Sequence, residues 1–285
     1  MTPCQLIRHT AARFRSAGIP DPENDSALLL ASLCGGEPLS LRLDTDTILE
    51  EPLLSRYELL TRQRLERIPL QYILGEAPFC GHLFTVDPHV LIPRPETERL
   101  CAWALDILKN YRDPRVLDLC CGSGCIGLSL KAASPEIRVT LSDISANALT
   151  VAAENVRRLS LKAELHQGDL LDGLLPGSFE LIVCNPPYIP TADCAALQEE
   201  VLFEPRNALD GGADGLDLYR RLIASADGIL VPGGALMMEL GIHQADSVSA
   251  LLAASGYMGI QVRKDLNGIE RMILAYQSDG GKYDR

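Results

Sequence analysis

The sequence lacks both a long apolar run and an excess of positive charge. A helix that spans a membrane needs about 20 consecutive apolar residues, and no stretch approaches that length, so we expect no membrane association. Lys and Arg total 26 against 38 Asp and Glu, which gives a net charge of −12. Because sequence-independent DNA binding needs a basic surface, this balance argues against a DNA partner. The negative charge does not exclude a basic protein as a partner.

An export signal and a metal-binding pattern are also missing. Residues 1–10 lack a charged segment followed by an apolar one, so we expect no signal peptide and a cytoplasmic location. The nine cysteines are then expected to be reduced thiols. Cys120, Cys121 and Cys125 lack paired C-x-x-C spacing and a neighbouring His, so we predict no metal site. Nothing in the chain demands more than a monomer.

The chain divides into three parts by pattern. Residues 1–74 carry helix signals, such as Thr2 before Pro3 and an apolar stripe from Leu6 to Phe14, and predict a small helical bundle. Residues 75–92 contain β-type residues around a glycine and predict a β-hairpin linker. Residues 93–285 form the third predicted domain.

Strands and helices alternate from Arg115 onward, which predicts an α/β fold with a mainly parallel, doubly wound sheet. The short 266–268 segment predicts a hairpin, and so an antiparallel strand at the edge. Seven strands are expected, at Val116–Cys120, Val139–Asp143, Glu164–Gln167, Phe179–Cys184, Ala235–Leu240, Ile260–Lys264 and Met272–Tyr276. The main helices between them are expected at Ala146–Leu159, Tyr219–Ile229 and Gln244–Ala254.

A glycine-rich turn follows the first of these strands. Gly122 and Gly124 let the backbone turn sharply and approach a ligand closely, and with Gly127 they satisfy G-x-G-x-x-G. Asp143 ends the second strand, at the spacing of a carboxylate that binds ribose hydroxyls. This pattern suits either NAD or S-adenosylmethionine.

Asn185, Pro186, Pro187 and Tyr188 follow the strand Phe179–Cys184, at the sheet edge where ligands bind in α/β folds. An amide nitrogen is a poor nucleophile because resonance delocalises its lone pair. The Asn185 side chain and the Pro186 backbone offer carbonyls, which the prolines hold rigidly, and Tyr188 can stack on a flat group. The segment therefore predicts methyl transfer to a planar nitrogen. The alternative interpretation is purely structural, namely that the two prolines end the strand and Asn185 caps it.

Three features favour S-adenosylmethionine over NAD. Asp118 can orient the glycine loop or the amino-acid part of the cofactor, and Asp169 and Leu170 are placed to meet an adenine edge and face. The Asn-Pro-Pro-Tyr segment has no role in hydride transfer. We therefore predict S-adenosylmethionine as the methyl donor, with S-adenosylhomocysteine as the product.

Together these segments resemble the HemK/PrmC family, whose members methylate a glutamine N5 in peptide chain release factors. The resemblance covers essentially the whole chain. It is carried by Pro93-Arg-Pro-Glu-Thr-Glu98, Asp118-Leu-Cys-Cys-Gly-Ser-Gly124, Asn185-Pro-Pro-Tyr188, Glu204-Pro205 and Gly211-Gly-Ala-Asp-Gly-Leu-Asp217. It implies a class I, Rossmann-like methyltransferase fold. It also implies a substrate, the glutamine of a Gly-Gly-Gln motif in class 1 release factors.

The resemblance further implies residue roles. Asp143 would bind the ribose, Leu170 with Asp169 the adenine region, and Asn185 to Tyr188 the glutamine side chain. The methionine and ribose part of the cofactor would be lined by Cys120, Cys121, Gly122, Ser123 and Gly124. One departure is Cys120, which stands where many methyltransferases have glycine. The helical domain 1–74 would help dock the release factor.

Other functions remain open on the sequence alone. A glutamine methyltransferase of a large-subunit ribosomal protein shares Asn-Pro-Pro-Tyr, and so do DNA adenine methyltransferases, which the acidic charge disfavours. A different class is a translation-factor-binding protein with a catalytically dead fold. Glu96, Glu98 and His243 are the candidates for a general base, although each also has an ordinary structural explanation.

Overall fold

The structure, a computed structural model, describes residues 1–278, so the last residues of the predicted domain 93–285 lie outside it. The chain forms two compact units. The helical unit comprises Met1–Glu76 and the segment Gln198–Phe203. The larger unit comprises Ala77–Leu197 and the chain from Glu204 onward. A separate linker over 75–92 stays a prediction.

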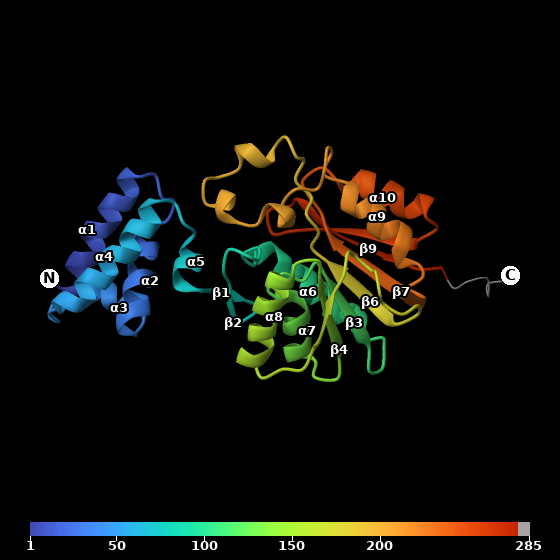
Figure 1. Cartoon of the computed structure of the whole chain (residues 1–285), viewed down its shortest axis with the longest axis horizontal. Helices are drawn as coiled ribbons and strands as arrows, with labels where there is room; N and C mark the ends of the chain where they lie inside the picture. The colour runs from blue at the N-terminus through green and yellow to red at the C-terminus, as the bar shows by residue number, and fades with distance from the viewer. Residues whose placement is uncertain (279–285) are drawn as a thin grey trace. The chain divides into compact units, whose positions relative to one another are not determined.

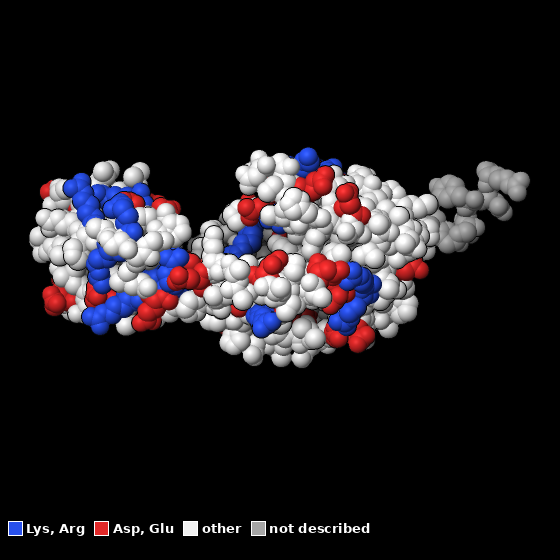
Figure 2. Space-filling view, turned by 90° about the horizontal axis from the view of Figure 1, so that it is seen from above, with Lys and Arg blue, Asp and Glu red and all other residues white. Residues whose placement is uncertain are grey.

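The helical unit is built from five helices that pack around apolar side chains such as Phe14 and Leu29 (Figure 1). Thr2 caps the first helix as the sequence predicts, since its side chain accepts from the Gln5 N–H and Gln5 returns a bond to the Thr2 N–H. The helices are α1 (Pro3–Ser16), α2 (Pro22–Cys34), α3 (Pro38–Leu43), α4 (Glu51–Leu65) and α5 (Leu70–Leu74). Residues 1–76 contain arginines but no lysine, and Figure 2 shows several arginine side chains on the visible face of this unit, with acidic side chains beside them.

A buried arginine anchors the distant segment 198–203 in the helical unit. Arg64 donates from Nε to Asp25 Oδ2 at 2.7 Å and from Nη1 to Glu200 Oε1 at 3.0 Å. Arg67 adds a bond to Glu200 Oε2 at 2.9 Å. Because the Arg64 side chain is only 5% exposed, both carboxylates offset the cost of burying its charge.

The larger unit carries a seven-stranded sheet in the order β5-β4-β3-β6-β7-β9-β8 (Figure 1). The predicted hairpin is present as β8 and β9, but the prediction of an antiparallel strand at the edge is wrong, because β9, which runs antiparallel to the other strands, lies between β7 and the edge strand β8. The predicted fold class is nevertheless confirmed. The seven strands are β3 (Arg115–Leu119), β4 (Arg138–Asp143), β5 (Glu164–Gln167), β6 (Phe179–Cys184), β7 (Leu230–Glu239), β8 (Met258–Lys264) and β9 (Glu270–Tyr276). A hairpin of β1 (Glu76–Phe79) and β2 (His82–Thr85) precedes them.

Helices cover both faces of the sheet (Figure 1). Neighbouring strand residues point to opposite faces, so Val116 joins one core and Leu117 the other. The first face is covered by α6 (Glu98–Leu108), α7 (Cys125–Ala133) and α8 (Ala146–Arg158), and the second by α9 (Asp217–Ala226) and α10 (Ala245–Ala254). Short 3₁₀ turns lie at η1 (Pro95–Thr97), η2 (Cys194–Ala196), η3 (Val201–Phe203) and η4 (Arg206–Ala208). None of the helices within residues 1–278 is long and apolar enough to cross a membrane.

Gly127 sets how closely α7 approaches the sheet. A Cβ at this position would lie 2.7 Å from Leu141 Cδ2 and 2.8 Å from Val139 Cγ1. We expect Gly127→Ala to lower the free energy of unfolding by about 1–3 kcal/mol, as overpacked cores do. Gly228→Ala is the matched control, because a Cβ there meets nothing within 4 Å. Urea unfolding of both variants measures the difference, and equal stabilities would show that the close packing at Gly127 is without consequence.

Candidate active site

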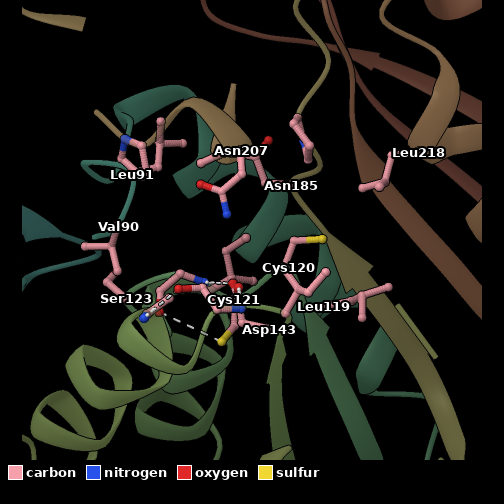
Figure 3. A pocket seen from close by; sticks show the side chains of 18 of the residues that line it. Val90, Leu91, Leu119, Cys120, Cys121, Ser123, Asp143, Asn185, Asn207 and Leu218 are labelled. Atoms are coloured by element: carbon pink, nitrogen blue, oxygen red, sulfur yellow. Dashed lines mark hydrogen bonds between the residues drawn. The ribbon is translucent and has the colours of Figure 1, made fainter. Parts of the chain in front are cut away.

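A cavity of about 280 Å³ opens at the carboxyl ends of β3, β4 and β6 (Figure 3). Its size is close to the lower end of ligand pockets, about 300 Å³. It brings together most of the predicted site residues from separate parts of the sequence. Those on its wall are Cys120, Cys121, Gly122, Ser123, Asp143, Asp169, Leu170, Asn185 and Pro187. Four of the predicted residues, all within residues 1–278, do not line the cavity: Asp118, Gly124, Pro186 and Tyr188.

The glycine loop is fixed by Asp143. Gly122 and Gly124 have φ values of 52° and 76°, in the left-handed region that favours glycine. The Gly122 N–H donates to Asp143 Oδ2 at 2.9 Å, and the Ser145 N–H donates to Asp143 Oδ1 at 2.9 Å. Asn155 holds the other side of the loop, since its Nδ2 donates to Ser123 O at 2.9 Å. The loop is therefore preorganised around a carboxylate on the cavity wall.

Asp118 lies behind the loop and orients it from within the core. Its Oδ2 accepts from the Gly127 N–H at 2.8 Å, which ties the end of β3 to the first turn of α7. Within residues 1–278 its Oδ1 has no hydrogen-bond partner. Burial raises the pKa of the Asp118 carboxyl to about 8, against the opposing effect of the Gly127 N–H. Of the two predicted roles, the structure provides the geometry for orienting the loop.

The raised pKa of Asp118 predicts a pH-dependent stability. An unfolded aspartate has a pKa of about 3.9, so between about pH 4 and pH 8 the folded state holds a proton that the unfolded state has released. The stabilising contribution is complete below that window and is lost as the pH rises through it, by about 1.4 kcal/mol per pH unit. Asp118→Asn keeps a carbonyl for the Gly127 N–H and does not titrate.

We therefore expect the free energy of unfolding to fall more steeply with pH in the wild type than in Asp118→Asn. Urea unfolding at several pH values between about 5 and 8 measures this slope. Other groups titrate equally in both proteins, so the difference between the curves isolates Asp118. Parallel curves would mean that Asp118 is already ionised in the fold.

Asp169 and Leu170 both lie on the cavity wall, and their predicted contact with an adenine stays a prediction. Asp169 also has an ion-pair partner. Its Oδ2 accepts from Arg221 Nη2 at 2.8 Å, and Arg221 itself lines the cavity from α9. Leu170 is buried with φ 54°, and it presents an apolar surface beside this pair. The wall therefore combines an apolar face with charged groups at its edge.

The Asn185–Tyr188 segment divides between cavity and core. Figure 3 shows Asn185 beside Asn207 on the wall, and Pro187 lines the same cavity. Tyr188 instead directs its hydroxyl to Glu239 Oε1 at 3.3 Å, and its ring packs with the second core. The predicted stacking of Tyr188 on a target group stays a prediction. In this structure Tyr188 positions the segment.

Glu239 is a buried carboxylate that joins two of the sequence motifs. Thr97, which lines the cavity, donates to Glu239 Oε2 at 2.6 Å, and Tyr188 donates to the other oxygen. Burial raises the pKa of Glu239, while the Thr97 hydroxyl and the charge of Arg271 oppose that shift. The 93–98 and 185–188 segments are thus held together beneath the cavity.

Glycines of the 211–217 segment allow its backbone to lie against Tyr188. A Cβ at Gly211 would lie 2.8 Å from Tyr188 Cα, and one at Gly215 would lie 2.3 Å from Tyr188 O. Gln244 completes the contact, because its Nε2 donates to Tyr188 O at 2.9 Å. These glycines therefore fix the course of the chain just after Asn185.

Glu204 makes a contact that sequence reasoning missed. Its buried carboxylate accepts from the Ile92 N–H at 3.0 Å and from Arg94. Arg94 and Pro205 both line the cavity, so the two flanking motifs meet on its wall. The only signal in the sequence was a glutamate followed by proline, which does not reveal a partner 110 residues away.

The three candidate bases do not reach the cavity. Within the described residues, Glu96, Glu98 and His243 are all absent from its wall. Glu98 accepts from the Cys80 N–H at 2.8 Å at the start of α6, and His243 has φ 67° in an exposed turn. None of these three candidates is therefore on the cavity wall, where the titratable residues are His89, Asp143, Asp169, Asp210 and the thiols.

Comparisons with known proteins agree on one family. Residues 101–253 match the methyltransferase small domain, and residues 5–75 match the PrmC N-terminal domain. A release factor glutamine methyltransferase of Deinococcus radiodurans is 42% identical over 275 residues, which cover 96% of this chain and 98% of that protein. A protein of the same name from Geobacter sulfurreducens is 41% identical over 270 residues, 94% of each chain.

Solved structures with lower identity share the fold. The hMettl16 catalytic domain, solved with an MAT2A 3′UTR hairpin, is 15% identical with a TM-score of 0.57, and the match covers 81% of this chain and 84% of that one. A 16S rRNA N2 G1207 methyltransferase of T. Thermophilus, solved with AdoMet and guanosine, is 18% identical with a TM-score of 0.51, over 71% of this chain and 49% of that one.

Proposed function

The chain belongs to the release factor glutamine methyltransferase family, and we propose that it methylates N5 of the Gly-Gly-Gln glutamine in class 1 peptide chain release factors. The methyl donor in this proposal is S-adenosylmethionine. The observation that carries the proposal is a single cavity whose wall holds both the glycine loop with Asp143 and the Asn185 side chain.

The cavity residues fit such a cofactor. The Asp143 carboxylate lies on the wall and is suited to ribose hydroxyls, and Leu170 offers an apolar surface for a purine. The glycine loop leaves space for a ligand, because a Cβ at Gly122 would meet only Val90 Cβ, at 4.0 Å. When bound, S-adenosylmethionine supplies an electrophilic methyl group on a sulfonium.

Asn185 and Pro186 are assigned to the target amide. The Asn185 carbonyl accepts one N–H of the glutamine side chain. The backbone carbonyl of Pro186, which is not itself on the wall but lies between the wall residues Asn185 and Pro187, is proposed to accept the other. Both bonds draw the nitrogen lone pair out of resonance and hold it in one direction. Correct positioning alone contributes up to about 7–11 kcal/mol to barrier lowering, so a general base is not required. Tyr188, held by Glu239, keeps this segment in place.

Methyl transfer from labelled S-adenosylmethionine to full-length release factor tests the proposal. We expect label in a wild-type class 1 release factor and none in a variant whose Gly-Gly-Gln glutamine is changed to alanine. A large-subunit ribosomal protein, offered in the same assay, tests the main alternative. Label only in the ribosomal protein would overturn the proposal. Absence of cofactor binding would instead favour a catalytically dead fold.

The remaining parts of the proposal follow from this substrate. The enzyme acts in the cytoplasm, where release factors are found. It acts as a monomer and has no DNA or membrane partner. The helical unit, with its arginine-bearing face, helps to dock the release factor (Figure 2).

A further inference from the structure

Two thiols meet at the junction of the glycine loop and the Asn185 segment. Strands β3 and β6 are parallel neighbours, and Leu119 pairs with Cys184. Cys120 follows Leu119, so it lies diagonally opposite Cys184, one residue beyond the partner that faces Cys184 across the two strands. Cys120 packs against the second core, which contains Cys184. Each one also borders a predicted ligand-holding group, since Cys120 opens the glycine loop and Cys184 precedes Asn185.

The pair is asymmetric in its access to solvent. Cys120 is partly exposed and lines the cavity, whereas Cys184 is completely buried. Cys121 also lines the cavity, but Figure 3 shows its sulfur turned away from that of Cys120, and its Sγ lies 3.9 Å from Gly122 O. A small reagent in the cavity thus reaches Cys120 directly, and the buried Cys184 lies on the adjacent strand in the core against which Cys120 packs.

The strand geometry is compatible with a disulfide. Adjacent strands lie about 4.8 Å apart, and disulfides join Cα atoms separated by about 4.4–6.8 Å. A diagonal pair on neighbouring strands falls within that range. Burial raises the pKa of the Cys184 thiol, and the neighbouring Cys120 acts in the same direction.

We infer that Cys120 and Cys184 form a redox modification site, in which a peroxide converts the two thiols into a reversible disulfide. In the first step the Cys120 sulfur displaces one oxygen of the peroxide, the O–O bond breaks, and a sulfenic acid and water form. In the second step the Cys184 sulfur attacks the Cys120 sulfur, and the sulfenic hydroxyl leaves with the Cys184 proton as water. A dithiol reductant returns both thiols.

The disulfide would change the cavity directly. It joins the first residue of the glycine loop to the residue before Asn185. The glycine loop and the Asn185 segment would then both move from the positions that they have in the reduced protein. The chain turns at Cys120, whose φ is 57°. A disulfide at this residue would therefore alter the direction of the glycine loop that follows it. The oxidised protein is therefore expected to be inactive until it is reduced.

Peptide mapping of the full-length protein tests the inference independently of methyltransferase activity. The reduced protein is treated with hydrogen peroxide, alkylated, digested with trypsin and analysed by tandem mass spectrometry. We expect a linkage between peptides 116–131 and 163–206, assigned by fragmentation to Cys120 and Cys184, and its loss after dithiothreitol. Cys34→Ser is the control, because it removes an exposed thiol of the helical unit and should leave the linkage unchanged.

Two variants keep the test decisive if one fails to fold. In Cys184→Ala, Cys120 should persist as a sulfenic acid that dimedone traps. In Cys120→Ser, Cys184 should stay reduced under the same treatment, because peroxide reaches it only through Cys120. The inference is overturned if both thiols of the wild type remain alkylated while Cys34 is oxidised, or if Cys120 is linked to another cysteine.

Discussion

Asn185→Ala is expected to lower turnover by about 10²–10³-fold, the loss seen when one preorganised hydrogen-bond group is removed from a reacting centre. The physical reason is that the alanine variant leaves one amide N–H of the glutamine without an acceptor. The lone pair then stays in resonance with the carbonyl. Asn185 lies on the cavity wall, and neither the glycine loop nor Asp143 makes a hydrogen bond to it. Cofactor affinity should therefore change little.

Turnover is measured with a release factor, and cofactor affinity is measured by calorimetry on the same preparation. Asn207→Ala is the matched comparison, because Asn207 is a second amide beside Asn185 on the wall and has no assigned contact to the target (Figure 3). Its turnover should fall far less. Equal losses in the two variants would contradict the specific assignment of Asn185.

Asp143→Ala is expected to weaken cofactor binding by about 10²-fold or more. The carboxylate accepts the Gly122 and Ser145 N–H groups at 2.9 Å each, and hydrogen bonds to charged groups contribute about 1.5–3 kcal/mol each. The variant loses both of these bonds together with the proposed ribose contact, so the loop is no longer held in its ligand-ready form. The cofactor affinity of Asp143→Asn should lie between those of the wild type and Asp143→Ala, because the asparagine amide retains one acceptor oxygen.

Calorimetric titration with S-adenosylhomocysteine measures this loss without turnover. Asp246→Ala removes the same charge from an exposed position in the first turn of α10, away from the cavity, and should bind like the wild type. If Asp143→Ala bound the ligand as tightly as Asp246→Ala, the cofactor would have to lie elsewhere.

The sheet and the glycine loop could be predicted because their signals are local. Strand β6 lies at Phe179–Cys184 as predicted, and Asp143 ends β4 beside the loop. Each depends on a short apolar run with a clear terminator, or on glycines that only a tight turn requires. Such patterns need no knowledge of what lies across the fold.

The contacts that complete the site, and those that anchor segment 198–203 in the helical unit, could not be predicted, because their partners are distant in sequence. Glu204 receives Arg94 from 110 residues away, and Arg64 binds Glu200 across 136 residues. Tyr188 illustrates the same limit. An aromatic residue after two prolines suggested stacking, but Glu239 at the end of β7 provides a buried acceptor for its hydroxyl. No local pattern indicates which carboxylate a tyrosine will meet.

Tandem mass spectrometry of a class 1 release factor, after incubation with this protein and S-adenosylmethionine, tests the proposed function most directly. We expect one added methyl group, located on the side chain of the Gly-Gly-Gln glutamine, and none when Asn185→Ala replaces the wild type over the same time. A release factor that stays unmodified while a ribosomal protein gains the methyl group, or a methyl group on any other residue, would contradict the proposed function.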